Sequence, residues 1–416
     1  MNPNITKISG GVTAPSGFVA GAASCGIKNP KAKRNDLVIV ASEDPCTAAA
    51  VFTSSKVKAA PVRVSATHVR DGDLQAVITN SGNANACTGP RGITDAKAMA
   101  KETAEAMGIN MRQVGVCSTG IIGVPLPIDR ITPRIPDLVK SLHGKGSDEA
   151  AKAMMTSDTV PKSASVEVNI GSKKIRIGAV AKGAGMICPN MATMICIVTT
   201  DAKIGKAELQ KATRLAADET FNRISVDGDM STNDTVFVLA NGRAGNRKIK
   251  AGSPSCQAFR AALTQVMMDL AKAIVRDGEK VTKFVELNVR GAPTFLDAKK
   301  VAEAVGNSLL VKCSWNGSDP NWGRIMHAIG YSKARFREEL IDIYFGGLAA
   351  CKNGLATETP MTQLTRIVSK REFTITIDLN LGDAEYTLYT NDISEAYVDY
   401  NRSEYSILEH KQRTGA

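Results

Sequence analysis

The chain has 416 residues, of which 43% are hydrophobic and 22% charged, a balance typical of a globular protein with two or three core-sized units. Its formal charge of +11 is dispersed and only 5% of its residues are aromatic, which argues against nucleic-acid binding. Nine cysteines without a CxxC pair argue against a disulfide framework or a zinc site. The absence of a long apolar run and of a signal-peptide pattern leads us to expect a cytoplasmic protein without a membrane span.

Apolar runs and helical patterns alternate along the first part of the chain. Leu37–Ala41 and Gln75–Thr79 predict buried strands. We expect a helix that Thr94 caps and that continues to Ala106. Val114–Cys117 predicts a short strand that ends at the sequence STG of residues 118–120.

The second part of the chain mixes hairpin patterns with one long helix. Residues 166–180 predict a hairpin that turns at Gly171, and Met194–Val198 predicts a strand. Apolar residues at spacings of three and four predict a helix over 257–276, which Gly278 ends in a left-handed conformation. Residues 373–381 and 385–389 predict an antiparallel hairpin. The mixture predicts an α+β protein, a layered α/β sandwich of mixed sheets.

Several common chemistries have no support in the sequence. Only four histidines are present, no serine lies in a GxSxG motif, and His327 lies in an apolar run that is typical of a core position. The segment from Asp227 resembles the start of a calcium loop, but Thr232 stands where that loop requires glycine and Val238 where it requires glutamate. We therefore expect neither a histidine-dependent hydrolase nor a metal site, and Asp227 and Asp229 are expected to be supporting hydrogen-bonding residues.

A threonine nucleophile needs no histidine if its own α-amino group is free, because that amine is a base near neutral pH. Cleavage of the chain directly before the threonine would free the amine. Thr193 suits this chemistry, since it follows the small residue Ala192 in a segment rich in glycine and proline and precedes an apolar strand. Attack of the Thr193 hydroxyl on the Ala192 carbonyl would give an ester that water hydrolyses.

At this segment the sequence resembles the ornithine acetyltransferase (glutamate N-acetyltransferase) family of arginine biosynthesis. The motif KGAGMICPNMATMI at 182–195 carries the resemblance. It is joined by NSGNANACTGP at 80–90, STGIIGV at 118–124, FNRISVDGDMSTNDTV at 221–236, RDGEK at 276–280, SDPNWGRI at 318–325 and YVDYN at 397–401. The resemblance therefore runs along nearly the whole chain, in the family's order.

The resemblance implies the roles of the catalytic residues. Thr193 matches the nucleophile, which the family frees by cutting the bond between Ala192 and Thr193. Thr119 and Gly120 match the pair that stabilises the oxyanion, a role that a hydroxyl and a backbone N–H can fill. The implied protein is a self-cleaving enzyme, similar to N-terminal-nucleophile enzymes, with fragments 1–192 and 193–416 in an α2β2 heterotetramer.

The resemblance also implies substrate-binding residues besides Thr193. Lys182 and Thr156 match two of them, although the family's TTDT reads TSDT here and Thr159 stays a rival of Thr156. Glu279 matches the glutamate that holds the cationic amine of the substrate. Asn401 matches a further binding residue, and Ser406 follows in a segment that is one residue longer than the family pattern.

The implied reaction is a ping-pong transfer of an acetyl group from N-acetylornithine to glutamate, with no cofactor. The sequence leaves open whether acetyl-CoA is a second acetyl donor and whether arginine inhibits the enzyme. Two alternatives differ in class. One is a self-cleaving amidase or aminopeptidase that releases the acyl group to water, and the other is a basic RNA-binding protein without catalysis.

Overall fold

The computed structural model describes residues 4–31, 33–188 and 194–402. The chain forms two compact units. Unit 1 comprises Met1–Asn222 and Met230–Ile274, and unit 2 comprises Arg223–Asp229 and Val275–Ala416. Among the helices in the described ranges, none has the length and apolar character that crossing a membrane requires.

Unit 1 is built on a mixed sheet in which we find nine strands among the described residues. The order is β1-β6-β7-β8-β9-β3-β4-β5, with β2 paired to β3. The pairs β8–β9 and β4–β5 are parallel and the other pairs are antiparallel. The strands are β1 (Ile5–Lys7), β2 (Phe18–Ala23), β3 (Leu37–Phe52), β4 (Asp73–Asn83), β5 (Val114–Ile121), β6 (Lys162–Ile170), β7 (Lys173–Lys182), β8 (Ile195–Thr200) and β9 (Thr235–Ala240).

The long strand β3 joins the two halves of this sheet. Its first half pairs with β2 and β4, the register shifts between Ala41 and Cys46, and its second half pairs with β9. Alternate residues of β3 enter two cores, because successive side chains of a strand point to opposite faces. Ile39 joins a cluster with α2 (Gly89–Met107), whereas Val40 joins a cluster with α5 (Ser147–Met154).

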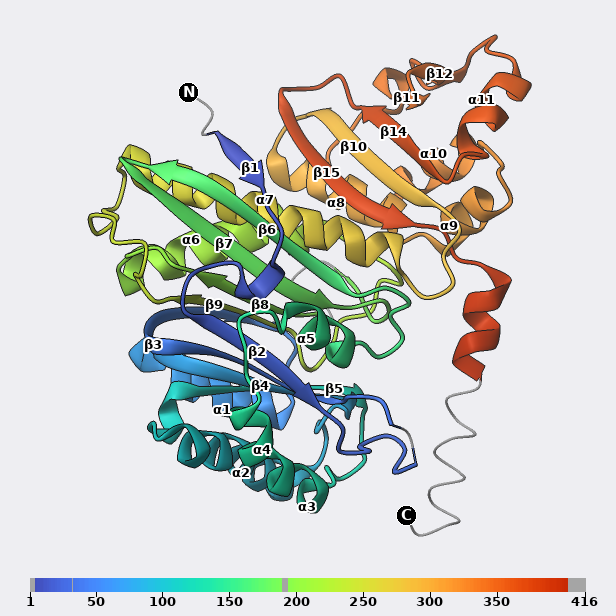
Figure 1. Cartoon of the computed structure of the whole chain (residues 1–416). Helices are drawn as coiled ribbons and strands as arrows, with labels where there is room; N and C mark the ends of the chain where they lie inside the picture. The colour runs from blue at the N-terminus through green and yellow to red at the C-terminus, as the bar shows by residue number, and fades with distance from the viewer. Residues whose placement is uncertain (1–3, 32, 189–193, 403–416) are drawn as a thin grey trace. The chain divides into compact units, whose positions relative to one another are not determined.

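Helices lie along this sheet. In Figure 1, α1 (Ala60–His68) and α2 lie together beside β4 and β5. The further helices of the unit are α3 (Ile128–Ile131), α4 (Ile135–Lys140), α6 (Lys206–Glu219) and α7 (Pro254–Arg276), whose last two residues belong to unit 2. The stripe predicted on the long helix is confirmed, because its apolar residues are all buried: Phe259, Leu263, Val266, Met267, Leu270 and Ile274.

Unit 2 contains a second mixed sheet, in the order β13-β12-β11-β14-β10-β15. Its strands are β10 (Phe284–Ala292), β11 (Asp342–Phe345), β12 (Leu348–Lys352), β13 (Leu355–Ala356), β14 (Glu372–Asp378) and β15 (Ala384–Asn391). The helices with it are α8 (Phe295–Gly306), α9 (Leu309–Asn316), α10 (Trp322–Gly330) and α11 (Met361–Val368). Apolar residues of β10, β14, β15 and α8 share one core. The predicted α+β class with mixed sheets is therefore confirmed.

One strand pairing predicted from the sequence is wrong. The two segments of the expected C-terminal hairpin do form β14 and β15, but β10 lies between them. β10 is parallel to β14 and antiparallel to β15. Alternation of apolar residues identifies strands without naming their partners, and here a strand from about 90 residues earlier takes the central position.

Three local predictions also differ from the structure. The helix expected from Thr94 begins earlier, with Thr88 at the N-cap, because Pro90 suits the first turn of a helix. The left-handed residue after α7 is Lys280, with φ 57°, and not Gly278. His327 is exposed on α10, although the run around it is apolar.

Candidate active site

The Ala192–Thr193 bond, on which the predicted chemistry depends, lies outside the described residues, and so does Ser406. The first described residue after the bond is Met194, which directly precedes β8 and is buried. Met194 is the residue to which the predicted nucleophile is bonded, so its contacts show what holds the chain directly after Thr193.

Asp234 holds the backbone of Met194. The Met194 amide donates to Asp234 Oδ1 at 2.9 Å, and the next residue, Thr235, donates its amide to the Met194 carbonyl at 3.1 Å. Asp234 is completely buried, and among the described residues its second oxygen, Oδ2, has no hydrogen-bond partner. Burial raises the pKa of this carboxyl well above its usual value. A buried carboxyl group with a raised pKa thus binds the backbone of the residue that follows the predicted nucleophile.

The neighbouring residue, Asn233, reaches the end of β5. Its Nδ2 donates to the carbonyls of Ser118 at 2.9 Å and of Ala84 at 2.7 Å. Adjacent residues in one loop therefore bind the start of β8 and the strand that carries the STG sequence. This arrangement fixes the predicted oxyanion-binding strand relative to the backbone that follows Thr193.

Thr119 and Gly120 lie in β5, paired with Ser81 and Gly82 of β4. Thr119 is buried, and its hydroxyl makes no hydrogen bond to any described residue. Gly120 has φ 135°, and a Cβ atom there would lie 2.3 Å from the carbonyl carbon of Gly82. Only glycine fits this close approach between two backbones. The local geometry is consistent with the predicted pair of a hydroxyl and a backbone N–H.

Thr156 and Lys182 are brought together by Asp158. The Thr156 amide donates to Asp158 Oδ2 at 3.0 Å, and Lys182 Nζ lies 3.8 Å from the same oxygen. Asp158 Oδ1 accepts from Lys162 Nζ and from the Gly183 amide, both at 2.7 Å. Although burial opposes ionisation, Lys182 and Lys162 hold the pKa of Asp158 well below its usual value. The cluster is therefore a buried carboxylate with two lysines.

In unit 2 the structure brings Glu279 and Asn401 together. Asn401 Nδ2 lies 3.4 Å from Glu279 Oε2 and also donates to the Tyr397 carbonyl at 3.0 Å. Burial raises the pKa of the Tyr397 phenol, and the negative charges of Asp227, Glu279 and Asp229 raise it further. Three carboxylates thus lie around one phenol, an environment that favours a cation.

Sequence reasoning missed four of these residues: Asp158, Lys162, Asn233 and Asp234. Asn233 and Asp234 belong to the motif at 221–236, and Asp158 belongs to the TSDT sequence that contains Thr156. The motifs therefore included these three residues, but the sequence assigned no role to them. Asn83 and Asn85 are also buried. Asn83 Nδ2 donates to the Val124 carbonyl and Asn85 Nδ2 to the Gly92 carbonyl of α2, so both are held by structural hydrogen bonds.

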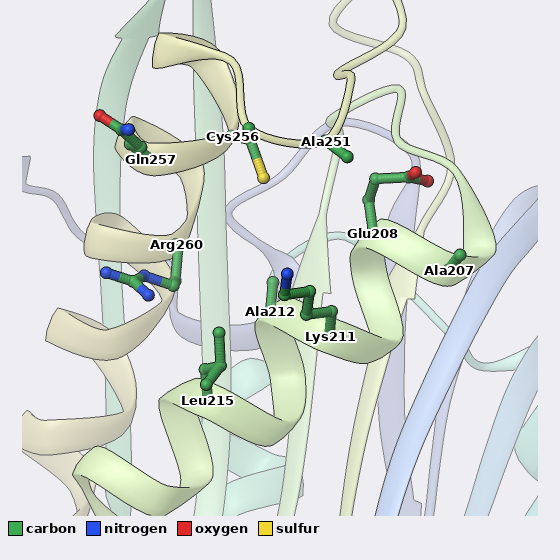
Figure 2. Close-up of a pocket in the computed structure, with 10 residues that line it drawn as sticks. Ala207, Glu208, Lys211, Ala212, Leu215, Ala251, Cys256, Gln257 and Arg260 are labelled. Atoms are coloured by element: carbon green, nitrogen blue, oxygen red, sulfur yellow. The ribbon is translucent and has the colours of Figure 1, made fainter.

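A cavity of about 420 Å³ lies elsewhere in unit 1, between α6 and the start of α7. Figure 2 shows Lys211 and Leu215 on α6, with Cys256 and Arg260 on α7. None of the predicted site residues is among those that line it. The cavity is therefore separate from the candidate active site.

Comparison with known proteins places the chain in a family. The model of the ArgJ family matches residues 19–406. The chain belongs to the ArgJ family. The resemblance predicted from the sequence motifs is confirmed by this match.

Relatives named ArgJ are similar to this chain over almost their full length. An arginine biosynthesis bifunctional protein ArgJ from Symbiobacterium thermophilum is 48% identical, with 95% of this chain and 98% of the relative covered. The ArgJ protein of Geobacter sulfurreducens is 46% identical, with 92% and 98% covered. A solved structure of ArgJ from Bacillus halodurans is 40% identical, covers 50% of this chain and 97% of its own, and has a TM-score of 0.48.

Proposed function

We propose that this chain is an acetyltransferase of arginine biosynthesis that transfers an acetyl group from N-acetylornithine to glutamate through Thr193. The chain is an acyltransferase of the ArgJ family. The observation that carries the more specific proposal is the pair Asn233 and Asp234, which tie the STG strand and the residue after Thr193 to one loop.

The first step is cleavage of the chain at Ala192–Thr193. The Thr193 oxygen attacks the Ala192 carbonyl carbon, the bond from that carbon to the Thr193 nitrogen breaks, and the nitrogen takes up the hydroxyl proton. Water then hydrolyses the ester, which leaves a carboxylate on Ala192 and a free amine and hydroxyl on Thr193. Asp234 supports this step by fixing the amide of Met194, the next residue.

The transfer then uses the freed amine as the base. It accepts the Thr193 hydroxyl proton while the oxygen attacks the acetyl carbonyl of N-acetylornithine. Thr119 and Gly120 donate to the oxyanion, a contribution of about 3–4 kcal/mol for one such donor. Ornithine leaves with the proton. The amine of glutamate then attacks the acetyl carbon, the bond from that carbon to the Thr193 oxygen breaks, and the proton lost by the attacking nitrogen passes to that oxygen, which gives N-acetylglutamate and free Thr193.

The substrate-binding roles follow from charge. Thr156 and Lys182 lie at the buried cluster around Asp158, where a cationic lysine suits a carboxylate. Glu279, close to Asn401, lies among carboxylates and suits the cationic amine of ornithine. Ser406 is proposed as the second C-terminal binding residue from the family resemblance alone.

The sheet of unit 1 explains how the fragments 1–192 and 193–416 can stay associated after cleavage. β7 lies before the cut and β8 after it, yet the two strands pair along their length. The pairing runs from Ile177 opposite Thr200 to Lys182 opposite Ile195. β3 and β9, also from different fragments, pair over six residues. An α2β2 assembly in the cytoplasm and a second activity with acetyl-CoA belong to the same proposal.

Thr193→Ala tests the proposal directly. We expect active wild-type protein to show two fragments on a denaturing gel, with threonine at the N-terminus of the second, and the variant to show one band and no acetyl transfer. Thr67→Ala, a change at an exposed threonine of α1, should cleave and transfer normally. Acetyl transfer by a protein with one intact band would refute the mechanism.

The same assay separates the amidase or aminopeptidase alternative. Acetyl transfer to glutamate is measured against release of acetate to water from N-acetylornithine. The proposal expects N-acetylglutamate as the main product, whereas an amidase would give acetate at the same rate with and without glutamate.

A further inference from the structure

A short basic loop of unit 1 takes no part in the proposed chemistry. It comprises residues 27–31 and 33–36, between β2 and β3. The loop carries four exposed cations: Lys28, Lys31, Lys33 and Arg34. Its sequence contains no acidic residue before Asp36, and within the described ranges its cations form no ion pair. The loop is therefore a local concentration of positive charge at the surface.

Hydrogen bonds to the backbone give this basic loop a defined shape. The Asp36 carboxylate accepts the amide of Cys25 at 2.7 Å on Oδ1 and the amide of Ile27 at 2.6 Å on Oδ2. Asn29 Oδ1 accepts the amide of Lys31 at 3.0 Å, which forms a turn at the tip of the loop. Asp36 thus closes the base of the loop with both of its oxygens, and the cations extend from a fixed backbone.

Two contacts place the basic loop beside the predicted active-site residues. Lys28 packs on Gly82 of β4, because a Cβ atom on Gly82 would lie 3.0 Å from Lys28 Cβ. Gly82 is paired with Gly120, a member of the predicted oxyanion pair. At the other end of the loop, the Arg34 guanidinium donates to the carbonyl of Met155, the residue before the predicted substrate-binding threonine. The loop therefore borders the predicted site at two points.

The charge of the loop indicates the kind of ligand that it suits. Several exposed cations at the edge of a site favour a ligand with several negative charges that remain in contact with solvent. N-Acetylornithine has a single carboxylate, for which Lys182 is already proposed. Acetyl-CoA, the second acetyl donor of the proposed function, carries phosphate groups at the far end of a long arm from its thioester. Phosphates are anions that clustered lysine and arginine side chains bind well.

We propose that the basic loop binds the phosphate groups of acetyl-CoA, while the thioester reaches Thr193. The inference rests on the proposed function, because it takes Thr193 as the group that accepts the acetyl. With this donor the Thr193 oxygen attacks the thioester carbon and the carbon–sulfur bond breaks. The Thr193 amine passes the hydroxyl proton to the sulfur, so CoA leaves as a thiol. The loop positions the donor and takes no part in this proton transfer.

The test compares two thioesters with and without the phosphates. The readout is the ratio of kcat/KM for acetyl-CoA to kcat/KM for S-acetylpantetheine, with glutamate as the acceptor. The loop variant Lys28→Gln/Lys31→Gln/Lys33→Gln removes three charges and keeps Arg34, which holds the loop to Met155. We expect the ratio to fall about tenfold or more through a higher KM for acetyl-CoA, because each exposed charge contact contributes a severalfold gain at most.

A matched variant removes the same number of charges elsewhere in unit 1. Lys101→Gln/Lys140→Gln/Lys173→Gln changes exposed lysines of α2, α4 and β7. Its ratio should stay within about twofold of the wild-type ratio, because solvent and salt screen charges that lie far from the ligand. Added salt should lower the ratio of the wild type and should leave that of the loop variant unchanged.

The outcomes separate this inference from the proposed function. If the loop variant lowers kcat/KM equally for both thioesters and for N-acetylornithine, the loop is structural and the inference is wrong. A higher KM for glutamate with an unchanged ratio would assign the loop to the acidic acceptor and would also overturn it. So would a wild type that uses N-acetylornithine but not acetyl-CoA, although that enzyme would still support transfer through Thr193.

Two further results complete the test. If the loop variant does not fold, Lys31→Gln at the tip of the loop decides. Its ratio should fall about threefold, and an unchanged ratio would overturn the inference. Absence of transfer from every donor in the wild type would refute the proposed function itself.

Discussion

The two regions that carry predicted site residues differ in their contact with solvent. In unit 1, Thr119, Asp158, Lys182 and Asp234 are all buried. In unit 2, Glu279 is half-buried and Asn401 is exposed. Interactions between charges are stronger where water is excluded, so fixed groups in a buried region can stabilise a developing charge. We propose from this difference that unit 1 supplies the chemistry and the binding site of the substrate carboxylate, and that unit 2 recognises the substrate amine. The following experiments test this division.

The largest effect is expected at Gly120. In Gly120→Ala the new Cβ would lie 2.3 Å from the backbone of Gly82, so β4 and β5 cannot keep their present separation. We expect loss of transfer activity and a fall of about 3 kcal/mol or more in the free energy of unfolding. Transfer activity is measured in the cleaved enzyme, and the free energy of unfolding by urea unfolding in the uncut Thr193→Ala background.

Gly123→Ala is the control for this change. Gly123 also has a positive φ, of 82°, but a Cβ there meets nothing within 4 Å. Gly123→Ala should lower the free energy of unfolding by about 1 kcal/mol, because it adds backbone strain but no steric clash. An equal loss of stability in Gly120→Ala and Gly123→Ala would show that backbone strain, and not the close approach of β4 and β5, is the reason why position 120 requires glycine.

The second effect concerns the hydroxyl of Thr119. Thr119→Val keeps the shape of the side chain and removes the donor, so kcat should fall about 100- to 1,000-fold with little change in KM. Thr79→Val, at a buried threonine of β4 whose hydroxyl is also without a partner among the described residues, should keep full activity. A rise in KM with unchanged kcat would instead assign Thr119 to substrate binding.

These two predictions concern residues that the sequence identified, and the reason is that their motif is local. The STG sequence follows a short apolar run, and the structure extends that strand through it as β5. The hairpin of 166–180 was likewise predictable, because its turn and its alternation lie in one continuous segment, and β6 and β7 do pair antiparallel. The stripe of α7 repeats at helical spacing along most of the helix and was equally clear.

What the sequence could not provide was contact between distant segments. The insertion of β10 between β14 and β15 joins strands that lie far apart along the chain. The roles of Asn233 and Asp234 likewise depend on contacts with Ser118 and Met194, which no spacing within one motif reveals. The pairing of Lys162 with Asp158 is an (i, i+4) spacing in a stretch that is not helical, so sequence periodicity gave no reason to pair them.

The third prediction moves to unit 2 and tests its role in recognition. Glu279→Gln removes the negative charge and keeps the size of the side chain. We expect KM for N-acetylornithine to rise about 10- to 100-fold, as for loss of a hydrogen bond to a charged group, while kcat changes little. Glu385→Gln, at an exposed glutamate of β15, is the control. If kcat fell as steeply as in Thr119→Val, the division between chemistry and recognition would be wrong.

The fourth prediction uses the pH dependence of stability at Asp234. Burial raises the pKa of this group in the folded state, so its contribution to stability is complete below the unfolded pKa of about 3.9 and is lost as the pH rises toward the folded value. An asparagine side chain at this position cannot ionise. In the Thr193→Ala background, Asp234→Asn should therefore gain stability relative to its parent by up to about 1.4 kcal/mol per pH unit above about pH 4.

Urea unfolding of both proteins at several pH values measures this difference. A constant difference between the two proteins across the range would mean that Asp234 ionises alike in the folded and unfolded chains. The unfolding is measured in the Thr193→Ala background because a single uncut chain can unfold in a two-state manner, whereas two fragments would make the midpoint depend on concentration.

The smallest effect is expected at Asn401. Its Nδ2 lies 3.4 Å from Glu279 Oε2, a long hydrogen bond between groups that water can reach, and it also donates to the Tyr397 carbonyl. Such a contact contributes about 1 kcal/mol or less, so Asn401→Ala should raise KM for N-acetylornithine no more than about fivefold. Arg402→Ala, at the neighbouring exposed residue, should have no effect. If Asn401→Ala raised KM as much as Glu279→Gln does, Asn401 would bind the substrate itself and would do more than orient the Glu279 carboxylate.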